Sequence, residues 1–189
     1  NPVKAFVYLS TMEVYGAPQT DEKITENHSC DIDTMSVRSS YPESKRLCET
    51  LCAAYASEYN VPAKVVRLTQ TFGEGVDYND GRVFAEFARC AIEGKDIVLK
   101  TKGETERNYI DIDDAVEAIY TVLFKGNKGE AYNAANEDTY CSIYEMACMV
   151  AKEFGEGKIK VIVADDVNAE KLGYAKTLKM NLSTAKLRE

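Results

Sequence analysis

The sequence predicts an α/β protein with a mostly parallel sheet and helices on both faces. Short apolar runs alternate with longer segments in which apolar residues have helical spacing, and this alternation favours parallel strands joined by helices. Residues 3–9 are apolar except for Lys4, which is typical of a strand buried on both faces. Residues 10–38 form a polar stretch too long for a simple connection, and such loops are usually functional.

The first helix is predicted over residues 40–59. Ser40 and Glu43 have the spacing of a capping box, and Pro42 is tolerated in a first helical turn. The apolar positions that follow recur at helical spacing and are Leu47, Cys48, Leu51, Cys52, Ala54 and Tyr55.

The remaining elements follow the same alternation. We expect a buried strand over 63–69 and turns at 71–75 and 77–81. Further helices are expected at 83–93, 111–124 and 142–154, and further extended segments at 97–99, 107–110, 130–134 and 158–164. The tail from residue 165 is weakly patterned.

Composition excludes several classes of protein. With 189 residues the chain can bury one sizeable core. A net charge of -8 argues against a nucleic-acid partner and against an anionic membrane surface. Four of the six cysteines lie in helical patterns, which indicates reduced thiols in a cytoplasmic protein. His28 and Cys30 lack enough neighbouring ligands for zinc, so no metal is expected.

Tyr41 and Lys45 are the candidate catalytic pair. Residues four positions apart share one helical face, so the phenol and the ammonium can reach one small site. A nearby ammonium stabilises the phenolate form, which allows a tyrosine to act as a general base. Taken alone, the same spacing also fits a solvated helix face.

The predicted sheet places other polar residues near this pair. Ligands of open parallel sheets bind beyond the carboxyl ends of the strands. Residues 10–13 follow the first predicted strand, and Thr69 and Gln70 end the second. We therefore expect these segments to converge with the start of the first helix.

Five blocks of sequence resemble the extended short-chain dehydrogenases/reductases, the NAD-dependent epimerase/dehydratase family. They occur in the order of that family and are the strand with Ser-Thr-Met-Glu-Val-Tyr-Gly (6–16), Tyr-Pro-Glu-Ser-Lys (41–45), and residues 67–75, 107–116 and 131–133. The resemblance implies a Rossmann-like parallel sheet, of which this chain is the C-terminal part, with a smaller α/β substrate-binding lobe. It also implies a nucleotide-sugar substrate, NAD as cofactor and a homodimer.

The resemblance assigns roles to individual residues. Tyr41 would take a proton from a sugar hydroxyl as hydride leaves for NAD, while Lys45 would bind the nicotinamide ribose. Thr11 would hydrogen-bond the reacting oxygen and Arg107 the nucleotide diphosphate. Further cofactor contacts would come from Ser10, Leu68 and Thr69, and a substrate contact from Gln70. Read from the residues alone, Thr11 could instead satisfy a strand end, and Arg107 could pair with Asp111 or Asp113.

Glu13 bears on the type of reaction. In the family, sugar 4,6-dehydratases carry Asp-Glu at this point and UDP-glucuronate decarboxylases carry Ser-Glu, whereas this chain has Met12-Glu13. Met12 cannot donate a proton, which argues against water elimination assisted from that position. Glu13 would be the residue that removes a proton beside the new ketone, or else it caps a loop. The function expected is therefore nucleotide-sugar epimerase/dehydratase, with a UDP-glucuronate decarboxylase or a non-catalytic dinucleotide-binding relative as alternatives.

The sequence departs from the family pattern in two ways. Gln70 stands where the family has Asn, and Glu74 where it has Pro. The glycine-rich turn G-x-x-G-x-x-G, which cradles the cofactor pyrophosphate, has no match. We therefore expect a part of a larger protein that binds NAD poorly by itself. Residues 1–73 would complete the NAD-binding domain, and residues 74–189 would form mainly the substrate lobe, with some segments returning to the sheet.

Overall fold

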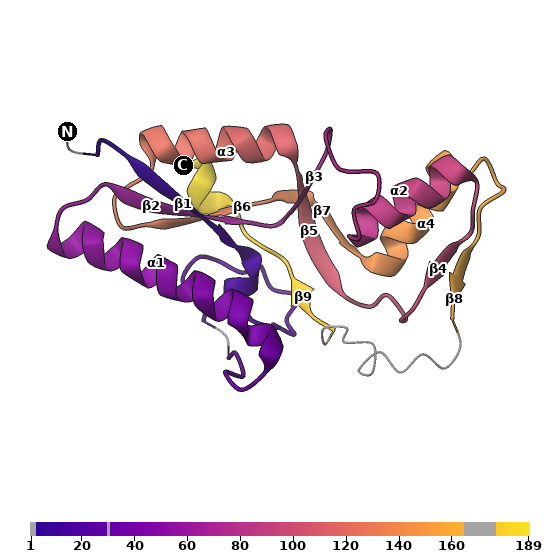
Figure 1. Cartoon of the computed structure of the whole chain (residues 1–189), viewed down its shortest axis with the longest axis horizontal. Coiled ribbons are helices and arrows are strands. Elements are labelled where there is room, and N and C mark those ends of the chain that lie inside the picture. The colour runs from indigo at the N-terminus through magenta and orange to yellow at the C-terminus, as the bar shows by residue number, and fades with distance from the viewer. Residues whose placement is uncertain (1–2, 30, 165–176) are drawn as a thin grey trace.

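The computed structural model describes residues 3–29, 31–164 and 177–189. Its larger part is built on three parallel strands in the order β1-β2-β6, with β1 at Phe6–Thr11, β2 at Ala63–Leu68 and β6 at Ala131–Ala134. The register runs from Phe6 opposite Ala63 to Thr11 opposite Leu68. The carboxyl ends of these strands therefore lie at one edge, as the predicted α/β class requires (Figure 1).

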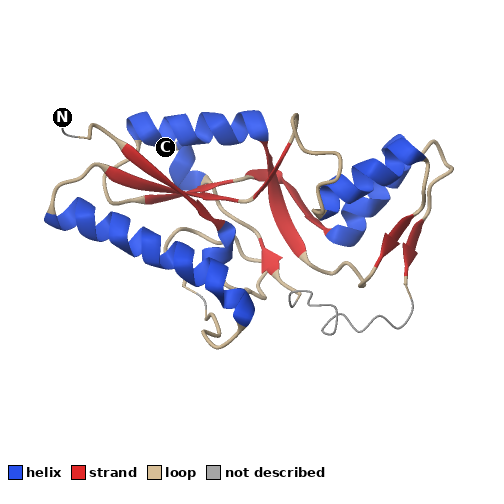
Figure 2. Cartoon of the chain, viewed as in Figure 1, coloured by secondary structure: helices blue, strands red, loops and turns tan. Residues whose placement is uncertain are grey.

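Two long helices cover opposite faces of this sheet, α1 at Ser40–Glu58 and α3 at Ile112–Lys125 (Figure 2). Val65 packs in a cluster with Cys52 of α1, whereas Val66 packs with Val122 of α3. Successive side chains of a strand point to opposite faces, so this alternation explains why β2 is apolar throughout. A short helix, α5 (Ala185–Arg188), packs beside β6.

A second sheet joins the two parts of the molecule. It contains β3 (Gln70–Phe72), β5 (Glu106–Asp111), β7 (Asn136–Ser142) and β9 (Lys179–Met180). Strand β5 is parallel to β3 and β9 and antiparallel to β7. The predicted turn at 71–75 is wrong at its start, because Thr71 and Phe72 belong to β3 and pair with β5.

The smaller part consists of α2 (Val83–Glu93) and α4 (Ile143–Phe154), packed on a pair of parallel strands, β4 (Ile97–Leu99) and β8 (Val161–Val163). Its core contains Phe87, Ile97, Leu99, Ala147, Ala151 and Ile159. The helix and strand predicted at 83–93 and 97–99 are confirmed with the same bounds. The strand predicted at 158–164 is shorter, because only residues 161–163 pair with β4.

Three predictions for the first strand and helix are wrong. The strand begins at Phe6 rather than residue 3, and it is not buried on both faces, since Phe6 is 46% and Leu9 is 43% exposed. Among the described residues, β1 pairs with β2 alone and so forms an edge of the sheet. Ser40 forms no capping box, because its hydroxyl donates to the carbonyl of Val37 in the short 3-10 helix η2 (Val37–Ser39).

The cysteine and membrane expectations rest on described residues only. Cys48, Cys52, Cys90, Cys141 and Cys148 are free thiols, whereas Cys30 lies outside the described residues. Within those residues no cluster of side chains could hold a metal ion, and no helix is both long and apolar enough to cross a bilayer. The tail from 165 falls outside the described residues up to 176 and then forms β9 and α5.

Candidate active site

The carboxyl end of β1 and the first two turns of α1 meet at the edge of the three-stranded sheet. Strand β1 ends at Thr11, which is buried and caps the following 3-10 helix η1 (Met12–Tyr15). The Thr11 hydroxyl oxygen accepts a hydrogen bond of 3.3 Å from the backbone amide of Glu13. Thr11 thus satisfies the strand end and still carries a hydroxyl beside the start of α1.

Lys45 is anchored to the main chain of β1. Its ammonium nitrogen donates a hydrogen bond of 2.8 Å to the carbonyl oxygen of Leu9, and it lies 4.9 Å from the ring centre of Tyr8. The ring centre of Tyr41 is 5.8 Å from the same nitrogen. The ammonium is therefore held beside the phenol at the strand end, as the spacing of the two residues predicts.

Tyr41 is 47% exposed, so its phenol is open to a ligand. The environment of the Tyr8 hydroxyl differs. Burial and, to a smaller extent, a hydrogen bond with Cys48 raise the pKa of Tyr8 to about 12. Of the two phenols around Lys45, Tyr41 is thus the one that lies exposed at the start of α1.

Glu13 lies in η1, one residue beyond the buried Met12. The turn that follows depends on Gly16, whose amide donates to the carbonyl of Glu13 at 3.0 Å and whose φ is 71°. A Cβ at Gly16 would lie 2.7 Å from the carbonyl oxygen of Asp31. Glycine is therefore required to hold η1, and with it Glu13, against the strand ends.

The other predicted site residues divide between two sheets. Leu68 lies opposite Thr11 in the register of β1 and β2, and the Thr69 hydroxyl donates to the carbonyl of Ala134 at 3.3 Å. Gln70 lies in β3 opposite Tyr109 of β5, and Arg107 precedes Tyr109 by two residues. The structure therefore places Ser10, Thr11 and Leu68 at the carboxyl ends of β1 and β2, Glu13 in η1 and Tyr41 and Lys45 in the first turns of α1, while Gln70 and Arg107 belong to the adjoining sheet.

Arg107 has an unused donor. Its Nε is buried and has no hydrogen-bond partner, and within the described residues it forms no ion pair with Asp111 or Asp113. Asp111 instead caps α3 by accepting from the amide of Asp113 at 2.9 Å. A buried guanidinium donor without a partner is costly, and an anionic ligand would satisfy it.

A charged network that the sequence did not predict lies behind the strand ends. Glu49 of α1 accepts a hydrogen bond from the hydroxyl of Ser10 at 2.5 Å and pairs with Arg67 of β2, whose Nη2 lies 2.6 Å from Oε2. Arg67 also donates to the hydroxyl of Tyr15 at 2.8 Å. Burial raises the pKa of Tyr15 to about 12, although Arg67 opposes this. Two signals could have indicated the pair: a lone arginine in an apolar strand, and a carboxylate four residues after Lys45.

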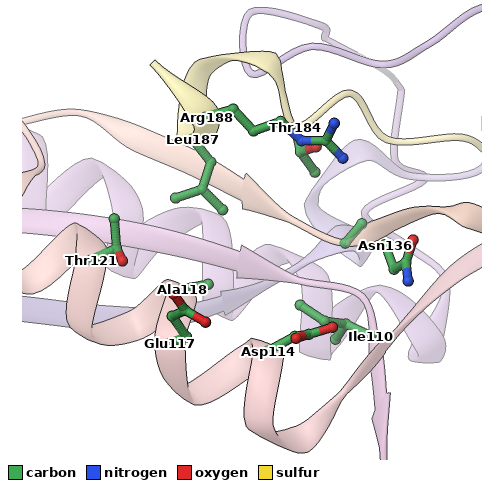
Figure 3. A pocket seen from close by; sticks show the side chains of 10 residues that line it. Ile110, Asp114, Glu117, Ala118, Thr121, Asn136, Thr184, Leu187 and Arg188 are labelled. Carbon is green, nitrogen blue, oxygen red and sulfur yellow. The ribbon is translucent and has the colours of Figure 1, made fainter.

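Figure 3 shows a separate cavity of about 400 Å³ on the α3 side of the sheet. Asp114 and Glu117 of α3 line it together with Arg188 of α5, and none of the sequence-predicted site residues does. The candidate active site is therefore the junction of β1, η1 and α1 rather than this cavity.

Comparison with known proteins assigns the family. Residues 1–135 match the model of the NAD dependent epimerase/dehydratase family. The chain belongs to this family. This member is 31% identical over 148 residues to UDP-glucuronic acid decarboxylase 1 of Xenopus tropicalis. The matched region covers 78% of the chain and 34% of that protein. It is 29% identical over 169 residues to UDP-glucuronic acid decarboxylase 6 of Arabidopsis thaliana, covering 88% of the chain and 49% of that protein.

The solved structures confirm the fold. UDP-glucose 4-epimerase of Thermotoga maritima, solved with UDP-glucose, superimposes with a TM-score of 0.81 at 21% identity. The match covers 98% of this family member and 56% of the epimerase chain. The chain thus spans about a third to a half of the length of these curated relatives and about half of this solved one.

Proposed function

We propose that the protein containing this chain is an NAD-dependent enzyme that oxidises a hydroxyl of a nucleotide sugar to a transient ketone, with Tyr41 as general base. The observation that carries the proposal is the anchoring of Lys45 on Leu9 with its ammonium beside the exposed phenol of Tyr41. Thr11 adds a hydroxyl at the end of the same strand.

The residues at this junction fit one part of NAD. Tyr41 and Lys45 offer a hydroxyl and an ammonium, which suit the hydroxyls of a ribose, and Ser10, Leu68 and Thr69 lie at the neighbouring strand ends. When bound, NAD supplies the acceptor for the hydride. The sequence has no G-x-x-G-x-x-G turn, so the contacts that this chain offers are those to the nicotinamide ribose.

The protein side chains handle the proton and the substrate. The phenolate of Tyr41, favoured by the nearby ammonium of Lys45, takes the proton of the sugar hydroxyl, while Thr11 holds the same oxygen. Arg107, whose Nε has no partner, would bind the nucleotide diphosphate, and Gln70 lies in the adjoining strand. Glu13 then removes a proton from the carbon next to the ketone.

A second candidate within this chemistry is decarboxylation of UDP-glucuronate. It is favoured by the two curated relatives named above, which are UDP-glucuronic acid decarboxylases. Oxidation of the hydroxyl at C4 gives a β-keto acid. Loss of CO₂ leaves its electron pair as an enolate, and a proton is added at C5 in place of the carboxyl group. The hydride removed in the oxidation would then return to C4, which gives a UDP-pentose. Met12 offers no proton for water elimination, which further disfavours the dehydratase reaction.

The experiment uses the whole protein that contains this chain, with NAD. UDP-glucuronic acid, UDP-glucose and dTDP-glucose are incubated separately, and products are identified by mass spectrometry and NMR. Tyr41→Phe is expected to lower turnover by about 10²- to 10⁴-fold. Tyr59→Phe, at the residue that follows the end of the same helix and is also exposed, is the matched control.

The outcomes separate the alternatives. A UDP-pentose with CO₂ identifies the decarboxylase, and a C4 epimer of UDP-glucose identifies the epimerase. No product from any of the three sugars, or full turnover by Tyr41→Phe, would overturn the proposal. Full turnover without Tyr41 would favour a non-catalytic role for the pair in dinucleotide binding.

We also infer that the protein is a homodimer that associates through α1. Leu47, Leu51 and Tyr55 form a stripe at spacing four and are 61%, 48% and 52% exposed, whereas Cys52 and Ala56 face the sheet. A second copy of this stripe would bury it. Leu51→Glu is expected to shift the sedimentation coefficient to that of a monomer, and an unchanged coefficient would contradict the inference.

The free thiols support a cytoplasmic location. We further propose that residues 1–73 belong to the NAD-binding domain and residues 74–189 mainly to the substrate lobe. The position of β6 in the sheet with β1 and β2 supports the expected return of some later segments to that domain.

A further inference from the structure

Two side chains of opposite charge on α1 are anchored to consecutive residues of β1. Lys45 donates to the carbonyl of Leu9 at 2.8 Å, and Glu49 accepts from the hydroxyl of Ser10 at 2.5 Å. Glu49 follows Lys45 by four residues and Tyr41 by eight, so all three share one helical face. At the helical rise, Glu49 lies about 6 Å from Lys45 and about 12 Å from Tyr41 along the axis.

Arg67 of β2 holds the carboxylate of Glu49 in a two-pronged ion pair. Nε lies 3.0 Å from Oε1, and Nη2 lies 2.6 Å from Oε2. The two side chains are 13% and 12% exposed, so solvent screens the pair weakly. Burial disfavours the charged form of Arg67, but the hydrogen bond with Glu49 and the proximity of Tyr15 outweigh it and raise the pKa of Arg67 above its ordinary value.

The third donor of Arg67 fixes the guanidinium in place. Nη1 donates to the hydroxyl of Tyr15 at 2.8 Å and to the carbonyl of Glu26 at 2.9 Å. The Tyr15 hydroxyl in turn donates to the side-chain oxygen of Asn133 at 2.6 Å. The cation is therefore locked beside Glu49 by α1, η1, the loop after η1 and β6.

We propose that Arg67 is a positioning residue of the candidate active site, whose charge neutralises Glu49 and so prevents this carboxylate from opposing the effect of Lys45 on Tyr41. The inference rests on the proposed function of Tyr41 as general base. Without Arg67, a nearly buried negative charge would stand one helical turn from Lys45 and would favour the neutral phenol.

The size of this effect follows from distance. A unit charge about 12 Å away, at an effective dielectric of about 20 to 40, shifts a titration by about half a pH unit to one unit. The other titratable or charged groups around the pair and Lys45 are Tyr8, Cys48 and Cys52 beside Lys45 and Glu49, Glu43 and Arg46 on α1, Arg38 on η2, Glu13 and Tyr15 on η1, and Glu26 and His28 in the following loop. Each is unchanged in the variants below.

The test measures kcat against pH in the whole enzyme with NAD and whichever of the three nucleotide sugars above is turned over. Arg67→Met is expected to raise the pH of half-maximal kcat by about half a unit to one unit. Glu49→Gln, which keeps an acceptor for Ser10 but leaves Arg67 unpaired, is expected to lower it by a similar amount. The double variant is expected to return to the wild-type pH.

Two further variants control for structural effects. Arg67→Lys keeps the charge and is expected to keep the profile. Lys158→Met breaks an exposed ion pair with Glu156 in the turn after α4, away from the site, and is expected to leave the profile unchanged. If Arg67→Met does not fold, the downward shift in Glu49→Gln still decides the question. Titration of the Tyr41 ring carbon Cζ by ¹³C NMR gives the same shift without turnover.

The outcomes are distinguishable. Single variants that lower kcat without moving the profile, or a double variant that stays shifted, would assign Arg67 a purely structural role and overturn the inference. Wild-type enzyme whose turnover does not depend on Tyr41 would instead overturn the proposed function, while the NMR titration would still decide the charge relationship.

Discussion

The ammonium nitrogen of Lys45 donates to the carbonyl oxygen of Leu9 at 2.8 Å, so a side chain of α1 is fixed by the main chain of β1. Leu9, which carries the acceptor, directly precedes Ser10 and Thr11 at the carboxyl end of β1, where a ligand of an open sheet would bind. The position of this charge is thus set by the packing of the helix on the strand.

Replacement of Lys45 by Met is expected to lower kcat by about 10²-fold or more, because the phenol of Tyr41 loses the charge that favours phenolate. The fold is expected to persist, since Lys45 is only half-buried. Steady-state kinetics of the whole enzyme with circular dichroism checks this, and Lys152→Met on α4 is the control. Equal activity of the two variants would show that the anchored ammonium plays no part in turnover.

The lowered pKa of Glu137 predicts that the stability of the fold depends on pH. Its carboxylate accepts from Lys23 and from the amide and hydroxyl of Thr184, at 2.7 and 2.8 Å, and these contacts lower the pKa of Glu137 from 4.5 to about 2. A carboxyl whose pKa is lower in the folded state stabilises the fold above the unfolded value, and this stabilisation is lost as the pH falls from about 4.5 to about 2.

Glu137→Gln is therefore expected to cost about 2 kcal/mol at neutral pH and to flatten the stability profile in that acid range. Urea unfolding at several pH values measures both effects. Glu153→Gln, in an exposed ion pair with Lys152, is the control and is expected to change little. A variant with the wild-type slope between these pH values would assign the acid sensitivity to other groups.

Gly103 fixes the approach of the β4–β5 connection to α4. Its φ is 70°, and a Cβ there would lie 2.8 Å from the backbone nitrogen of Tyr144. Gly103→Ala is expected to destabilise the protein by about 2 kcal/mol or more, seen as a lower melting temperature. Gly81→Ala, where a Cβ meets open space, is expected to stay within about 0.5 kcal/mol of wild type. Equal melting temperatures for the two variants would refute the steric argument.

The capping box lies at α4 and not at α1. Ser142 accepts from the amide of Glu145 at 3.1 Å, and Glu145 accepts from the amide of Ser142 at 2.8 Å. Ser142→Ala is expected to cost about 1 kcal/mol in denaturant unfolding. Ser40→Ala, which has the same sequence spacing but no such box, is expected to cost less. The reverse order of the two costs would contradict the assignment.

The contrast between Ser40 and Ser142 shows where sequence reasoning succeeds and where it does not. Both serines stand three residues before a glutamate, yet η2 already occupies the residues before Ser40 and takes its hydroxyl. The periodic helices α2 and α4 were predicted closely, because their apolar faces alone determine them. Strand β7 was missed because Asn136–Ser142 has little apolar alternation and is specified by pairing with β5.

The candidate site divides in the same way. The approach of Lys45 to Tyr41 and to the end of β1 could be predicted, since helical spacing and strand polarity favour both contacts. The pairing of Glu49 with Arg67 was not predicted, because the sequence signals at the two residues lie 18 positions apart on different elements and do not state that they are partners. The exposure of Leu47 and Leu51 was also missed, since a helical apolar stripe does not state which face meets the sheet.

The outer edge of β1 has a practical consequence for work on this chain by itself. Among the described residues β1 pairs on one side only, and Phe6 and Leu9 are exposed beside its main-chain amides and carbonyls. Such an edge is a template for another strand, including one from a second copy. Preparations of the isolated chain are therefore expected to self-associate as the concentration rises, and dilute samples are the ones in which its intrinsic stability is measured.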